Sequence, residues 1–156
     1  MPSQLQAELK QRKPFESLEQ EAALSIKRTA AELDYGVSEL LKPLGITPTQ
    51  YNALRILRGA EPGGLCRNEI RDRLIARVPD ATRLLDRMEE TGLVIRSREG
   101  EDRRFVHTRI TRAGLALLDR LHDKLAALEA RQLGHLGREK LETVIGILAE
   151  VRRKCH

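Results

Sequence analysis

Aromatic residues and cysteines are scarce in this chain. Its 156 residues include no Trp, two Tyr and two Phe. Proteins that read single-stranded DNA or RNA stack the bases on aromatic side chains, so this composition argues against that class. The two cysteines, Cys66 and Cys155, are too few for a disulfide framework and lack the Cys-x-x-Cys spacing of a zinc site. We therefore expect neither a bound metal nor a cofactor.

Long apolar runs and catalytic motifs are also missing. No apolar run approaches the roughly 18 residues that a membrane-spanning helix needs, and the first residues have no apolar segment typical of a secretory signal. With so few cysteines, this predicts a cytoplasmic protein without a membrane partner. The sequence has no Gly-rich phosphate loop and no HExxH motif, and its four histidines have no partner at a useful spacing. It is therefore predicted not to be an enzyme.

Charge indicates what the protein binds. Charged residues make up 33% of the chain, and 28 Lys and Arg against 23 Asp and Glu give a net charge of +5. A basic protein of this size favours a polyanionic partner. Because aromatic residues are rare, we expect double-stranded DNA, read through its grooves and phosphates.

Apolar periodicity predicts long helices at both ends of the chain. Residues 15–44 carry apolar side chains at steps of three and four, which predicts one amphipathic helix in which Gly36 leaves room for a slight break. The pattern returns from 111 to the end, in two helices separated by residues 134–137. Within so short a chain these stripes have no matching partner, which predicts a homodimer; the alternative is a monomeric bundle.

The pattern in the middle of the chain predicts a winged helix-turn-helix. Thr47 and Gln50 form a capping box with Pro48 at the first helical position, which predicts a helix over 48–58. The segments predicted to follow are helices 67–74 and 79–91, then strands 93–98 and 104–110 around the polar turn 99–102. The expected fold is mainly α with a small β-wing. It divides into dimerisation helices at 1–45 and 112–156 and a DNA-binding lobe at 46–111.

The helix predicted at 79–91 has the two faces that a recognition helix needs. Its apolar side is formed by Ala81, Leu84, Leu85 and Met88. On the other side, arginines can bind guanine in a bidentate manner, and threonine can reach phosphate or a thymine methyl. The alternative is an ordinary solvated face, on which Asp86 and Glu90 pair with Arg83 and Arg87.

Arginines are concentrated in the predicted hairpin. Residues 93–112 contain six arginines and three acidic residues. An extended ribbon can lower a guanidinium into the narrow minor groove, where the potential is most negative. Asp102 lies two residues from Arg104 and is placed to hold that side chain extended. The alternative is again a solvated charged surface.

Several segments together resemble the MarR family of bacterial transcriptional regulators. They are residues 81–89, Gly92-Leu93-Val94, Asp102-Arg103-Arg104 through Ile110-Thr111, and Gly114. The resemblance covers about residues 33–121. It implies a homodimer that binds a pseudo-palindromic operator, most often as a repressor, and that a small-molecule effector releases from DNA. Pro79-Asp80 departs from the family, in which Ser or Thr is more usual; Asp80 either caps the helix or accepts from cytosine N4.

The resemblance also implies site residues. Arg104 is the minor-groove arginine, supported by Asp102. The full set of predicted DNA contacts is Arg77, Asp80, Thr82, Arg83, Arg87, Arg96, Arg98, Arg103 and Arg104. Tyr35, Tyr51 and His122 are candidates for an effector cleft, although Tyr51 also fits the core.

Two other functions are considered. Cys66, at a predicted helix N-terminus beside Arg67 and Arg71, is a candidate for a thiol redox switch, because such a position favours the thiolate. Its alternative role is a simple cap in place of threonine. A structural dimer without DNA binding is the remaining alternative, and the arginines at 83 and 104 argue against it.

Overall fold

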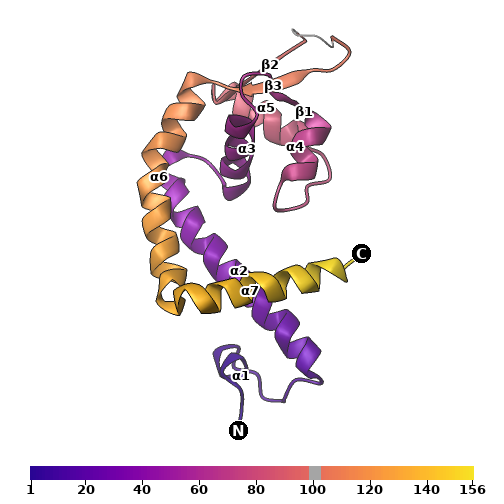
Figure 1. The fold of residues 1–156 in the computed structure, drawn as a ribbon, viewed down its shortest axis with the longest axis vertical. Helices are drawn as coiled ribbons and strands as arrows, with labels where there is room; N and C mark the ends of the chain where they lie inside the picture. Colours follow the sequence, from indigo (N-terminus) through magenta and orange to yellow (C-terminus); the bar gives the residue numbers. More distant parts are fainter. Residues whose placement is uncertain (99–102) are drawn as a thin grey trace.

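The computed structural model describes residues 1–98 and 103–156. Figure 1 shows a lobe at one end, from which α2 and α6 run side by side; α7 then leaves the far end of α6 in a new direction. The helices are α1 (Gln4–Glu8), α2 (Leu18–Leu41), α3 (Pro48–Gly59), α4 (Arg67–Arg73), α5 (Thr82–Glu90), α6 (Arg112–Leu133) and α7 (Gly137–Arg153). The 3-10 turns are η1 (Lys42–Leu44) and η2 (Gly134–Leu136). The strands are β1 (Leu65–Cys66), β2 (Val94–Ser97) and β3 (His107–Ile110).

The long N-terminal helix begins at a side-chain cap and has no break. The Ser17 hydroxyl accepts a hydrogen bond from the Gln20 amide at 3.0 Å. The helix continues through Gly36 without a break, which confirms the single long helix that the apolar pattern predicted. A Cβ at Gly36 would lie 2.5 Å from Nε2 of Gln132 on α6. At Gly36, α2 therefore lies against the end of the Gln132 side chain, which would have to shift to make room for a larger residue. The short α1 was not predicted.

The start of the lobe follows the sequence closely. Thr47 Oγ1 accepts from the Gln50 amide at 3.2 Å, and Gln50 Oε1 accepts from the Thr47 amide at 3.0 Å. This confirms the predicted capping box. Leu54 and Leu57 of α3 are fully buried, as the apolar pattern predicted.

Three boundaries in the lobe differ from the prediction. The helix expected from Pro79 begins at Thr82, because Asp80 Oδ1 accepts from the Thr82 amide at 2.9 Å and so ends the preceding loop. The two predicted strands are shorter, and residues 103–106 lie outside β3. A third strand, β1, pairs antiparallel with β3 and gives the order β1-β3-β2. At two residues it is too short to show an alternating pattern.

One core joins the lobe to α6. Buried side chains of α3, α4, α5 and the sheet form a single cluster with the inner face of α6, which includes Leu117, Leu118 and Leu121. The start of α6 lies very close to the sheet at Gly114. A Cβ there would lie 2.6 Å from the Leu93 carbonyl oxygen and 2.7 Å from Ile110 Cγ1. The sheet therefore has no space for a side chain at this position.

Gly114→Ala should lower the free energy of unfolding by about 1–3 kcal/mol, because the added methyl overpacks the core. Urea denaturation measures this change. Gly59→Ala in α3 is the matched control, since no atom lies within 4 Å of a Cβ built there. That variant should be neutral or gain less than about 1 kcal/mol. Equal losses in both variants would contradict the packing argument.

The last helix has no core of its own. Within the described chain α7 has no buried residue, and Ile145 and Ile147 are 65% and 55% exposed. Leu18, at the start of α2, is 81% exposed. These apolar faces find no partner within one copy of the described chain. No helix in the described ranges is long and apolar enough to cross a membrane.

Candidate nucleic-acid interface

α5 presents arginines on the side that the core leaves open. Leu85 and Met88 are fully buried, whereas Arg83 and Arg87, one turn apart, are exposed. Within the described residues, neither arginine pairs with Asp86 or Glu90, the pairing that an ordinary solvated face would have shown. Two guanidinium groups therefore point outward from one face of a nine-residue helix.

A hydrogen-bonded chain holds the N-terminal end of α5 against α4. The Thr82 hydroxyl accepts from Arg67 Nη1 at 2.9 Å and donates to Asp80 Oδ1 at 2.7 Å. The hydrogen bond from the Thr82 amide, and then that from its hydroxyl, lower the pKa of Asp80 below its usual value. Asp80 therefore bonds to the first residue of α5, while Ala81 occupies the N-cap position, and a contact of Asp80 with cytosine N4 stays a prediction. The Thr82 hydroxyl donates a second hydrogen bond to the same oxygen of Asp80.

Arg96 of β2 fixes the wing on α5. Its Nη2 lies 2.7 Å from Asp86 Oδ1 and 2.9 Å from Glu89 Oε1, and its backbone amide donates to Glu89 Oε2 at 2.9 Å. The side-chain hydrogen bond with Glu89 raises the pKa of Arg96, and the same bond lowers that of Glu89. Arg96 was predicted to contact DNA. In the structure it forms a cluster with two carboxylates, here called the wing clamp (Arg96, Asp86 and Glu89), and its contact with DNA stays a prediction.

The wing clamp should make stability depend on pH. The pKa of Glu89 is lowered from its ordinary value of 4.5 by Arg96, so its stabilisation is present above pH 4.5 and is lost as pH falls through the lower, folded-state pKa. Glu89→Gln should be less stable at neutral pH and should lose less stability on acidification. Thermal denaturation from pH 7 to pH 3 measures this. Glu90→Gln, at an exposed neighbour, should follow the unmodified chain.

The remaining predicted DNA contacts lie around α5. Arg98 follows β2, and Arg103 and Arg104 precede β3; all three are exposed. The Arg104 guanidinium lies 5.9 Å from the centre of the Phe105 ring. Arg77 is exposed in the loop before α5, where its Nη2 lies 3.4 Å from Nε2 of His156. Asp102 lies outside the described residues, so its support of Arg104 stays a prediction.

The predicted effector residues lie on three different helices. Tyr35 on α2 is 65% exposed and His122 on α6 is exposed. Tyr51 on α3 is half-buried, and its hydroxyl accepts from Arg55 at 2.9 Å. None of the three lines the cavity between α4, α5 and the segment leading into β3, which is described next. Their role in effector binding stays a prediction.

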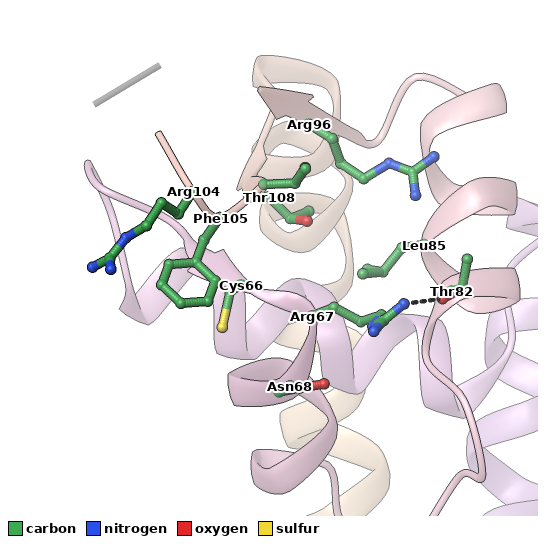
Figure 2. A pocket seen from close by; sticks show the side chains of 10 residues that line it. Cys66, Arg67, Asn68, Thr82, Leu85, Arg96, Arg104, Phe105 and Thr108 are labelled. Carbon is green, nitrogen blue, oxygen red and sulfur yellow. Dashed lines mark hydrogen bonds between the residues drawn. The ribbon is translucent and has the colours of Figure 1, made fainter. Parts of the chain in front are cut away.

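That cavity was not predicted. It has a volume of about 430 Å³ and lies between α4, α5 and the segment leading into β3 (Figure 2). Its lining is Cys66, Arg67, Asn68, Thr82, Leu85, Arg96, Arg104, Phe105, Val106 and Thr108. Cys66 is half-buried at the N-cap of α4, and its amide donates to Glu69 Oε1 at 3.4 Å. The described residues contain no cluster of His, Cys, Asp and Glu suited to a metal ion.

Three helices followed by an antiparallel hairpin, with arginines on the third helix and on the hairpin, define a winged helix-turn-helix protein of the DNA-binding class. Residues 44–104 match the MarR family. A MarR transcription factor from Planctomyces limnophilus is 40% identical, with a TM-score of 0.66, and the alignment covers 86% of this chain and 98% of that one.

Two other proteins agree with this assignment. A curated relative from Bacillus subtilis, the uncharacterized HTH-type transcriptional regulator YkoM, is 28% identical over 86% of this chain and 88% of its own length. A mutant of Escherichia coli MarR, solved with operator DNA, is 26% identical with a TM-score of 0.74, over 83% of this chain and 91% of that one. The chain belongs to the MarR family of transcriptional regulators and is not an enzyme.

Proposed function

We propose that this regulator binds a pseudo-palindromic duplex operator as a homodimer and acts as a repressor that a small-molecule effector releases. The observation that carries this proposal is the pair Arg83 and Arg87, exposed on α5 beside an arginine-bearing wing. The Escherichia coli relative in complex with operator DNA supports it, as does the repressor CouR, solved on a 23-mer duplex and 28% identical to this chain.

The contacts divide between the two grooves. In the proposed complex α5 lies in the major groove, where Arg83 and Arg87 reach base edges. Arg104 enters the minor groove from the wing. Three further exposed arginines contact phosphates: Arg77, Arg98 and Arg103. Asp80 and Thr82 act indirectly, because their hydrogen bonds fix the end of α5 that enters the groove.

The exposed apolar faces supply the dimer interface. α7 presents Val144, Ile145, Ile147 and Val151, and a second copy of the chain is the partner that buries them. A two-fold axis then sets the recognition helices of the two subunits about 34 Å apart, one turn of DNA. This spacing is why the operator is proposed to be pseudo-palindromic.

Binding of the DNA upstream of the protein's own coding region tests the proposal. Fluorescence anisotropy at two salt concentrations should give a dissociation constant at least a thousandfold lower for this fragment than for a shuffled one, about 10³ being the low end of operator specificity. Affinity should fall as salt rises, because phosphate contacts release counterions. Equal affinity for both fragments would contradict an operator-specific role.

A further inference from the structure

A single residue, Thr111, connects the DNA-binding lobe to the long C-terminal helices. β3 ends at Ile110 and α6 begins at Arg112, so Thr111 alone lies between them. Figure 1 shows α6 running from the sheet to the far end of the molecule, where η2 leads into α7. The direction in which α6 leaves the lobe is therefore set by the contacts of Thr111 and of the first turns of α6.

Thr111 makes hydrogen bonds to both sides of this junction. Its hydroxyl donates to the Gly92 carbonyl oxygen at 2.7 Å and accepts from the Gly114 amide at 3.1 Å. Its backbone amide donates to the Leu93 carbonyl oxygen at 3.1 Å. Gly92 and Leu93 lie between α5 and β2, whereas Gly114 is in the first turn of α6. One side chain thus links the end of the proposed recognition helix to the start of α6.

The carbonyl group that accepts this bond belongs to a turn held by α5. Gly92 has a φ of +77°, a conformation that favours glycine after the end of a helix. Its amide donates to the Glu89 carbonyl oxygen at 3.0 Å, and the Leu93 amide donates to that of Met88 at 2.9 Å. Both acceptors lie in the last turn of α5. The bond from Thr111 therefore reaches α5 through a fixed turn.

Packing beneath the junction limits α6 in a different direction. A Cβ at Gly114 would lie 2.6 Å from the Leu93 carbonyl oxygen, so α6 cannot move closer to the sheet. Leu117 and Leu118 then bury the next turn in the core. Apolar burial is not directional, whereas a hydrogen bond weakens steeply as its angle departs from linear. The bond from Thr111 to Gly92 therefore resists a sideways rotation of α6 that apolar packing resists less.

We propose that Thr111 is a positioning residue, which sets the angle between α5 and α6 and thereby the spacing of half-sites that the dimer accepts. α6 has 22 residues and is about 33 Å long. A rotation of about 10° at its start moves its far end by about 6 Å, nearly two base-pair steps of about 3.4 Å. The inference rests on the proposed homodimer and operator for the spacing, but not for the angle.

The Thr111 hydroxyl has two functions that substitutions can separate. As the N-cap of α6 it accepts from Gly114, and an aspartate at this position does the same. An ionised carboxylate cannot donate a hydrogen bond, so Thr111→Asp keeps the cap and loses the bond to Gly92. Thr111→Ser keeps both bonds, and Thr111→Val loses both. A residue that serves only as a cap would tolerate aspartate.

Operators of different spacing test the proposal. Fluorescence anisotropy gives dissociation constants for the operator in the upstream fragment and for a copy with one base pair inserted between the half-sites. The unmodified chain and Thr111→Ser should bind the longer operator at least about tenfold more weakly, the lower end of what two net hydrogen bonds, one per subunit, contribute. Thr111→Asp and Thr111→Val should reduce this ratio to less than about threefold.

Thr47→Val is the control, because it removes the threonine cap of α3 and leaves Thr111 unchanged. This variant should be less stable but should keep the spacing ratio, since a smaller folded fraction weakens binding to both operators equally. Either Thr111→Asp or Thr111→Val suffices if the other misfolds. A ratio kept in these variants, lost in Thr111→Ser or lost equally in Thr47→Val would overturn the proposal.

Spin labels measure the angle between α5 and α6 without DNA. Glu90→Cys and Glu129→Cys place labels at exposed positions of the two helices, in a chain that also carries Cys66→Ser and Cys155→Ser. Dilution with unlabelled protein restricts the measured distances to one chain. Thr111→Asp should broaden the distance distribution by at least about 3.4 Å, one base-pair step. If no operator is bound specifically, the proposed function fails and this measurement alone decides the role of Thr111. Equal widths would refute it.

Discussion

Arg83→Ala should weaken operator binding by about 1–3 kcal/mol per half-site and relax base preference at one symmetric position, as expected for loss of a bidentate contact to guanine. Arg83 is exposed on α5 and has no ion-pair partner among the described residues. The measurement is a set of binding isotherms on an operator randomised one base pair at a time. Arg120→Ala, at an exposed position of α6, is the control and should leave affinity unchanged.

Arg104→Ala should behave differently from Arg83→Ala. A minor-groove arginine responds to groove width and potential, so its loss should weaken all AT-flanked sites to a similar extent. The slope of log affinity against log salt should also fall by about one phosphate-equivalent per subunit. If neither variant loses affinity, the DNA-binding surface has been assigned to the wrong elements.

Ile145→Glu should dissociate the dimer. Ile145 is 65% exposed in a single chain, and the proposed interface buries it together with its copy in the partner. An unpaired buried charge costs several kcal/mol, so the dimer dissociation constant should rise by more than about a hundredfold. Sedimentation velocity at micromolar concentration measures the change.

The control for Ile145→Glu is a substitution that changes the net charge by the same amount. Arg153→Gln also lowers the charge of α7 by one, but Arg153 lies on the side of the helix away from Val144 and Val151. That variant should remain a dimer. Dimers of equal stability in both variants would contradict the assignment of the interface to the apolar face of α7.

Helices of this protein could be predicted where local signals dominate. The capping box at Thr47, the apolar stripes of α2 and α6, and the two-faced pattern of α5 are contained in spacing alone. Their existence and type were confirmed. The start of α5 was placed at Pro79, three residues too early, because the sequence does not show that the Asp80 side chain bonds to the Thr82 amide.

The parts that could not be predicted depend on contacts between distant residues. β1 is a strand only because Leu65 and Cys66 pair with β3, more than forty residues later. The bond from Arg67 to Thr82 joins residues fifteen positions apart, and neither has a periodic signal that indicates the other. Nothing in the sequence distinguishes Arg96 from the other arginines of the predicted hairpin. Its pairing with Asp86 and Glu89 depends on how the hairpin folds over α5.

The wing clamp has a consequence for the DNA that this protein recognises. Arg96 ties β2 to α5 by both its side chain and its backbone, and so fixes where this strand lies on the helix. In the proposed complex, these contacts resist a change in the distance along the duplex between the bases contacted by α5 and the tract entered by the wing. One inserted base pair would separate the two by about 3.4 Å. Each half-site then has a fixed length. Inserting or deleting a base pair within it should lower the affinity for DNA more than a single base substitution does.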